Sequence, residues 1–215
     1  MSVLSLQDMA PGFADSTAQS QVVFRCALDA LARPGSPVGI PAASLVSPSV
    51  NTCTASASLL LALLDQDCTL WLSPTLANGP AAAWLRFHTG CQIEADCSQA
   101  DFVWAASIAE LPPLDQLKQG SAEYPDQSAT CVVDVTAWRA AAAAEAGAIS
   151  LRGPGVRDAL TLAVDGLDAN FVRQHHAMQA HAPCGVDMFF CAGDAVLGFP
   201  RSVRLNSGAG SHACT

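Results

Sequence analysis

The sequence predicts an α/β fold, a layered αβα sandwich built around a mixed sheet. Segments with helical periodicity alternate along the chain with short apolar segments rich in β-branched and aromatic residues. The last two apolar segments flank a Gly193-Asp194 turn, which predicts an antiparallel hairpin. A chain of 215 residues is long enough for one domain to bury most of its apolar surface. We therefore expect a single domain over residues 1–205 and a disordered Gly/Ser-rich tail over 206–215.

The first element is a helix over residues 17–33, because apolar residues recur there on one face and Pro34-Gly35 follows. Ser16 or Thr17 is the expected N-cap. The alanine-rich stretch 138–146 favours a helix by propensity. Local patterns predict the other helices at 54–64, 81–87, 114–119 and 168–180, the last capped by Asp168. Strands are expected at 38–40, 68–72, 91–94, 100–105, 130–135, 148–152 and 160–164, and in the hairpin that begins at 186.

The composition indicates a protein that buries apolar surface against other proteins. The chain is 51% hydrophobic and only 13% charged. Its net charge is −9, with nine arginines and one lysine, so it lacks the basic stripe that nucleic-acid binding requires. The longest solid apolar run, 59–64, is too short for a membrane span, and nine cysteines without a CxxC pair are typical of reduced thiols. We expect a cytoplasmic protein that binds neither nucleic acid nor membrane.

Two ionic residues, Asp187 and Arg201, lie where an apolar strand pair should accommodate no unpaired charge. Two interpretations remain open. In the first, they satisfy each other or nearby backbone groups and fix the register of the hairpin, so that Asp187 is a structural ionic residue. In the second, Arg201, which follows Pro200 at a strand end, faces an anionic ligand or a partner subunit.

Three more basic residues are candidates for anion binding or for an interface. Arg86 and His88 lie at the end of a predicted helix, where the helix dipole alone stabilises a cation, but they could also share an anion or contact a partner chain. Arg152 ends a predicted strand, and the glycines at 153 and 155 would let a ligand approach the backbone. This loop lacks the lysine, the Ser/Thr and the spacing of a Walker motif, and a structural turn is the competing interpretation.

No self-contained catalytic apparatus is visible in the sequence. His175, His176, His181 and Cys184 lack the spacing of metal ligands, and the histidines are expected at the surface or as caps. Lys118 is expected to be exposed on a polar helix end, a poor position for a Schiff base with pyridoxal phosphate. We expect no catalytic residue, no metal and no cofactor in this chain.

An ordered set of segments carries a family resemblance. The segments are 22–35, 55–73, 85–90, 100–105, 124–130, 151–156 and the run from Pro183 to Ser202, which contains PCGVDMFF and GFPRS. Together they resemble the PhnH subunit of bacterial carbon-phosphorus lyase, in the right order over nearly the whole chain. The stretch WRAAAAAEAG and the tail resemble that family less.

The resemblance implies a cytoplasmic phosphonate-degradation protein that forms a homodimer and joins the PhnG, PhnI and PhnJ subunits in a core complex. It implies a fold like a degenerate large domain of pyridoxal-phosphate-dependent transferases, without the cofactor. It also implies that the assembly displaces adenine from ATP by a phosphonate, giving a ribose 1-phosphonate 5-triphosphate, and that another subunit cleaves the C–P bond. It supplies no catalytic residues.

Three hypotheses follow. In the first, the chain is a required subunit with a structural or assembly role and no active site of its own. In the second, Arg86, His88, Arg152 and Arg201 form a cradle for a phosphonate or nucleotide anion. In the third, the chain is an autonomous pyridoxal-phosphate enzyme that depends on Lys118.

Overall fold

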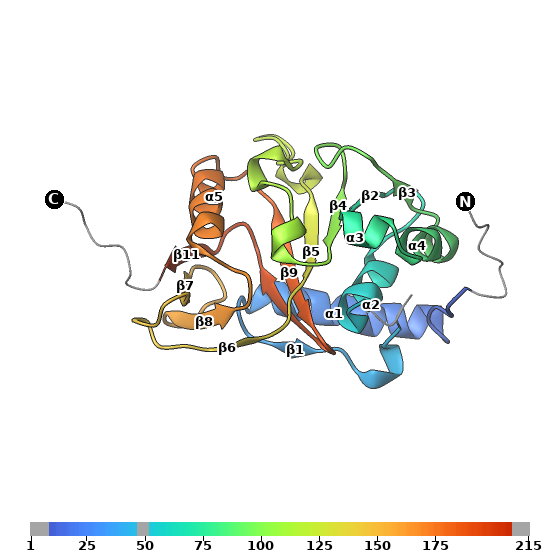
Figure 1. Cartoon of the computed structure of the whole chain (residues 1–215), viewed down its shortest axis with the longest axis horizontal. Helices are drawn as coiled ribbons and strands as arrows, with labels where there is room; N and C mark the ends of the chain where they lie inside the picture. Colours follow the sequence, from blue (N-terminus) through green and yellow to red (C-terminus); the bar gives the residue numbers. More distant parts are fainter. Residues whose placement is uncertain (1–8, 47–51, 208–215) are drawn as a thin grey trace.

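The computed structural model describes residues 9–46 and 52–207 and contains a seven-stranded mixed sheet (Figure 1). Its strands are β1 (Val38–Gly39), β2 (Thr69–Leu72), β3 (Gln92–Ile93), β4 (Phe102–Ala105), β5 (Thr130–Asp134), β9 (Asp187–Ala192) and β10 (Ala195–Phe199). They lie in the order β1-β10-β9-β5-β4-β2-β3. The five strands from β9 to β3 run parallel, and the hairpin strand β10 and then β1 are antiparallel. The mixed sheet and its closing hairpin are as the sequence predicts.

A second, four-stranded antiparallel sheet was not expected from the sequence. It consists of β6 (Trp138–Ala140), β7 (Ile149–Arg152), β8 (Leu160–Val164) and β11 (Arg204–Ser207) in the order β11-β7-β8-β6. The expected αβα sandwich is therefore wrong on one face of the large sheet, where the second sheet packs together with α5. Strand β11 includes the first two residues of the expected tail, and residues 208–215 lie outside the described residues.

The helices are α1 (Ser16–Ala32), α2 (Thr54–Leu63), α3 (Pro74–Ala77), α4 (Ala81–Thr89) and α5 (Ala169–Gln179), with 3₁₀ turns at Ala42–Ser44, Ile108–Glu110, Leu114–Gln116 and Pro125–Gln127. The N-cap of α1 is Asp15, whose carboxylate accepts from the Ala18 N–H over 3.0 Å, and not Ser16 or Thr17 as expected. Asp168 caps α5 as predicted, by accepting from the Phe171 N–H over 2.8 Å. No helix of the described residues is long and apolar enough to cross a membrane.

The two faces of the large sheet build two separate cores. Alternate residues of each strand point to opposite faces, so that Val132 and Phe189 pack under α1, α2 and α4. Their neighbours Val133 and Phe190 pack against the second sheet and α5. Figure 1 shows α5 and the second sheet at one end of the molecule, and α4 with β3 at the other.

Two helix predictions are wrong. The alanine-rich stretch from Trp138 begins with β6, because Trp138 pairs with Val164 of β8 and packs on the core beside the second sheet. This tertiary contact overrides the helix propensity of alanine. The expected helix 114–119 is only a 3₁₀ turn, since Leu117 leaves the helical path at φ −84°, ψ 159° and is buried.

Candidate functional site

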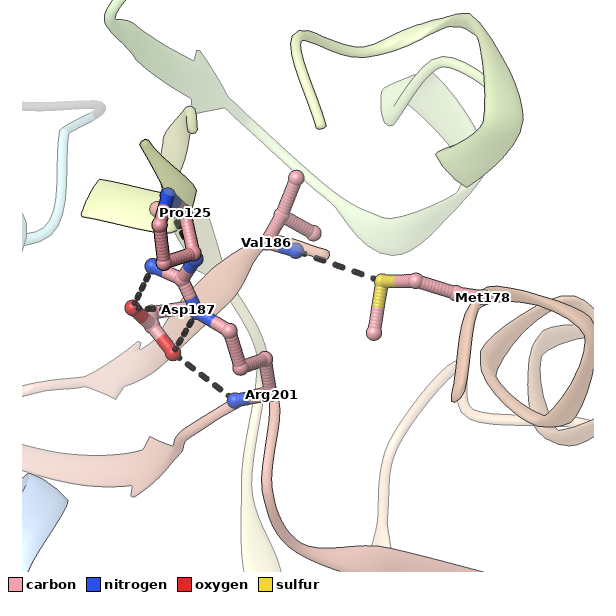
Figure 2. Close-up of polar contacts among 5 residues, drawn as sticks. All are labelled: Pro125, Met178, Val186, Asp187 and Arg201. Atoms are coloured by element: carbon pink, nitrogen blue, oxygen red, sulfur yellow. Dashed lines mark hydrogen bonds and ion pairs between the residues drawn. The ribbon is translucent and has the colours of Figure 1, made fainter. Parts of the chain in front are cut away.

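Arg201 and Asp187 form an ion pair where the closing hairpin begins and ends. Asp187 opens β9, and Arg201 comes two residues after β10. The Arg201 backbone N–H donates to Oδ1 of Asp187 over 2.7 Å, and Nη2 donates to Oδ2 over 2.6 Å. Nε lies 3.3 Å from both carboxylate oxygens, and Nη1 donates to the carbonyl of Pro125 (Figure 2). Only 20% and 21% of the two side chains are exposed.

The contacts of Arg201 account for the charge of both residues within the fold. All three guanidinium nitrogens have an acceptor, and a charge-assisted pair of this kind is stronger than a neutral hydrogen bond. The preceding residue is also held, because Val186 N–H donates to Sδ of Met178 on α5 over 3.3 Å (Figure 2). This geometry agrees with the interpretation in which Asp187 and Arg201 satisfy each other.

Lys118 was expected to be exposed on a polar helix end. The structure instead places it in a second ion pair. Its Nζ lies 2.6 Å from Oδ1 of Asp101, and about a third of each side chain is exposed. Oδ2 of Asp101 accepts from the hydroxyl of Thr69 over 2.7 Å and from its N–H over 3.0 Å. Burial raises the pKa of Asp101, but the hydrogen bonds from Lys118 and Thr69 outweigh burial and lower it overall. The Lys118 amine is therefore engaged in holding strand ends together.

Arg86 and His88 lie in the last turn of α4. A ring nitrogen of His88 lies 3.1 Å from the carbonyl oxygen of Ala10, which also accepts from Nε1 of Trp84 over 2.9 Å. His88 is thus tied to the chain's own amino-terminal segment. Arg86 lines a surface hollow of about 430 Å³ together with residues 90–93 beside the edge strand β3.

Arg152 is the last residue of β7, and Arg204 is its direct cross-strand partner on β11. Strand β7 lies at the opposite end of the molecule from α4 (Figure 1). The four basic candidates therefore do not converge in one chain: Arg86 and His88 share one helix end, Arg201 is paired with Asp187, and Arg152 neighbours Arg204.

Asp134 was missed by the sequence analysis. It lies at the carboxyl end of β5, where Oδ1 accepts from Nε1 of Trp104 and Oδ2 from the N–H of Cys53, each over 3.4 Å. Burial raises its pKa to about 6, although hydrogen bonds from Ser56, Cys53 and Trp104 partly oppose the shift. A signal was present in the sequence, because an acidic residue directly follows the apolar run 131–133.

His175 is fully buried on α5, which corrects the expectation of a surface or capping residue. Neither of its ring nitrogens has a hydrogen-bond partner, and the ring stacks on Phe171 with centroids 6.4 Å apart. Burial, with a smaller effect of His176, lowers its pKa to about 4. Within the described parts of the chain, no three His, Cys, Asp or Glu side chains lie close enough together to hold a metal ion.

Comparison with known proteins decides the family. The family model described as bacterial phosphonate metabolism protein (PhnH) matches residues 11–206. The chain belongs to the PhnH family. A PhnH relative in Rhizobium meliloti (strain 1021) is 36% identical over 194 residues, which cover 90% of this chain and 93% of the relative. That relative is named alpha-D-ribose 1-methylphosphonate 5-triphosphate synthase subunit PhnH.

A second relative is the putative C-P lyase subunit protein HtxG of Stutzerimonas stutzeri. It is 33% identical over 112 residues, which cover 52% of this chain and 54% of HtxG. The PhnH match takes in the Asp187–Arg201 and Lys118–Asp101 ion pairs and all but the last residue of the two sheets, and it includes the stretch around Trp138 that resembles the family less. Membership of the PhnH family confirms the resemblance drawn from the ordered segments.

Proposed function

We propose that this member of the PhnH family is a subunit of a carbon-phosphorus lyase core complex in phosphonate catabolism. The names of both relatives support this proposal, since one is a subunit of a ribose 1-methylphosphonate 5-triphosphate synthase and the other a putative C-P lyase subunit. The chain is required for the ATP-dependent step that forms the ribose 1-phosphonate 5-triphosphate and releases adenine. It works in the cytoplasm as a homodimer bound to the PhnG, PhnI and PhnJ subunits.

The role of the chain within the complex is structural. The observation that supports this role is that its ionic residues bind each other within the fold. Arg201 and Lys118 are both bound to carboxylates that open strands of the large sheet or directly precede them. Large apolar side chains meanwhile remain exposed, including Phe24 (46%) and Leu28 (52%) on α1 and Phe87 (56%) on α4. Exposed apolar side chains of this size support docking on partner proteins.

The fold part of the proposal is a likeness to the large domain of pyridoxal-phosphate-dependent transferases, degenerate and without cofactor. The parallel centre of the mixed sheet supports it, and so does the engagement of Lys118 by Asp101. The purified chain mixed with pyridoxal phosphate should show no visible absorbance band. A band that Lys118→Ala abolishes would instead establish the autonomous enzyme.

Co-expression with the PhnG, PhnI and PhnJ subunits tests the proposal. With an affinity tag on one of those three subunits, we expect this chain to co-purify in stable stoichiometry and the complex to form the triphosphate product from ATP and methylphosphonate. The complex prepared without this chain should lose that activity. Elution of the chain alone, while the other three subunits assemble and remain active, would refute the proposal.

Variants of the exposed apolar residues identify the docking surface. Phe24→Ser with Leu28→Ser changes α1, and Phe87→Ser with Ile93→Ser changes the end of the molecule that carries α4 and β3. At least one double variant should retain the thermal stability of the isolated chain and lose co-purification. Full retention in both would show that neither surface carries assembly.

A further inference from the structure

Arg152 and Arg204 face each other across the antiparallel pair of β7 and β11. Their neighbours Leu151 and Leu205 also pair directly, and both leucines are completely buried. Because side chains alternate along a strand, the two arginines project together from the outer face of the second sheet, where both are exposed. Directly opposite residues have Cβ atoms roughly 5 Å apart. Two arginine side chains therefore leave the sheet from neighbouring positions on one face.

Nothing in the described part of the chain neutralises this pair. Arg152 and Arg204 take part in none of its ion pairs or side-chain hydrogen bonds. The four strands of the second sheet carry three arginines and no acidic residue, although the whole chain has a net charge of −9. The third, Arg139, is paired with Glu145. Like charges placed directly opposite each other destabilise a sheet, and a bound anion would turn that repulsion into attraction.

The backbone segments beside the arginine pair, at the end of β7 and the start of β11, lie close together. Gly153 follows Arg152 at φ +141°, and a Cβ added there would lie 3.1 Å from the Ser202 carbonyl oxygen and 3.3 Å from Cα of Val203. The absence of a side chain at 153 thus allows the end of β7 to approach the start of β11. Ser150 and Asn206 form the next pair on the same outer face and add a hydroxyl and an amide beside the arginines.

We propose that Arg152 and Arg204 form a binding site for a phosphoryl or phosphonyl anion on the outer face of the second sheet. Each guanidinium presents a planar fork of donors that matches two oxygens of such a group. Ser150 and Asn206 lie where they contact a polar substituent of the same ligand. The site does not depend on the proposed subunit role, because one isolated chain contains all of it.

Calorimetric titration of the purified full-length chain in low-salt buffer tests the site. The probes are inorganic phosphate and methylphosphonate, with acetate as the carboxylate control. We expect both phosphorus anions to bind and acetate to give no heat in the same concentration range. Arg152→Gln and Arg204→Gln should each weaken binding by about 10- to 100-fold. The matched control Arg139→Gln, on the same sheet but paired with Glu145, should leave the affinity unchanged.

Thermal unfolding supplies a second readout, because the variants and the wild type should respond differently with and without phosphate. Without phosphate, each Gln variant should unfold about 1–3 °C above the wild type, because repulsion is relieved. Phosphate should then raise the unfolding temperature of the wild type more than that of either variant. Absence of heat with both phosphorus anions would overturn the proposal. Equal binding by the variants, or acetate bound as tightly as phosphate, would overturn it as well.

Discussion

Arg201 ties the two ends of the closing hairpin together by binding Asp187 through its side chain and its own backbone N–H. The same guanidinium holds the Pro125 carbonyl, so one residue joins β9, the turn after β10 and the 3₁₀ turn at Pro125 (Figure 2). Removing either charge leaves the other partly buried without a counter-ion. Two strands and a turn that are distant in sequence therefore depend on this one pair.

The Asp187–Arg201 pair should be a clear contributor to stability. Asp187→Asn and Arg201→Met are each expected to lower the free energy of unfolding by about 1.5–3 kcal/mol, since a charged hydrogen-bonded partner is lost. Urea denaturation followed by circular dichroism measures the change. The double variant should cost little more than either single variant, because both singles break the same interaction.

The exposed pair Arg33–Asp29 is the matched control. Its side chains are 59% and 58% exposed, and Arg33, the C-cap of α1, lies four residues after Asp29. Arg33→Gln should change the free energy of unfolding by no more than about 0.5 kcal/mol. If Arg33→Gln and Arg201→Met cost the same, the structural role given to Asp187 and Arg201 is wrong.

Gly198 is expected to be irreplaceable where α1 crosses β10. A Cβ added at Gly198 would lie 2.5 Å from the carbonyl carbon and oxygen of Ala30, both backbone atoms that cannot turn aside. Gly198→Ala should therefore lower the free energy of unfolding by about 1–3 kcal/mol. Gly39→Ala, on the adjacent strand β1 with nothing within 4 Å of its added Cβ, should leave stability unchanged or slightly higher. Thermal unfolding of the two variants side by side measures this contrast.

Local sequence patterns predict most of the large sheet, because its strands are short apolar runs bounded by turns. In the second sheet, the strands expected at 148–152 and 160–164 are present as β7 and β8, but β6 and β11 were not predicted, for a physical reason. Strand β11 pairs with β7, which lies far back in the chain, and its outer residues Arg204 and Asn206 are polar. Such a strand shows no apolar run, and only its pairing partner reveals it. Trp138 likewise joins a strand through contact with β8, which no local propensity encodes.

The candidate site residues were likewise only partly predictable from the sequence. The presence of two charges in an apolar hairpin is enough to predict that Asp187 and Arg201 need partners. Register, which pairs Arg152 with Arg204, depends on the whole fold and cannot be read from Arg152 alone. The burial of His175 depends on the second sheet and α5 closing over the same core, so a sequence spacing that rules out a metal site does not reveal it.

His175 should make the protein sensitive to acid. In the folded chain its pKa is lowered by burial to about 4, while the unfolded residue protonates near 6.5. Between these values the unfolded state binds more protons, so the free energy of unfolding falls as the pH drops. His175→Leu should remove this dependence and gain up to about 3 kcal/mol over the wild type at pH 4. Urea denaturation at several pH values measures the slope.

His181→Gln is the control for this slope. His181 is exposed just beyond the end of α5, where a ring nitrogen lies 3.1 Å from the carbonyl oxygen of Ala177. The variant should follow the wild-type pH dependence. A pH profile of His175→Leu that also coincides with the wild type would contradict the buried, neutral state assigned to His175.

Asp134 should produce the opposite slope in nearly the same pH range. Burial raises its folded pKa to about 6 from an ordinary 3.8, so the stability it contributes is complete below 3.8 and is lost as the pH rises through 6. Asp134→Asn should therefore gain up to about 3 kcal/mol relative to the wild type above pH 6 and nothing below pH 4. Asn retains one oxygen to accept from Trp104 or Cys53.

Asp134 accepts from Trp104 of one core and His175 stacks on Phe171 of the other, so the contributions of the two groups should add. In the wild type the gain from His175 and the loss from Asp134 largely cancel each other between pH 4 and 6. Relative to the wild type, the stability of Asp134→Asn should rise with pH, that of His175→Leu should fall with pH, and the double variant should follow the wild-type slope. Denaturation curves of the four proteins at pH 4, 5 and 6 measure these slopes. Parallel profiles for all four would exclude both pKa shifts, because no common background can hide slopes of opposite sign.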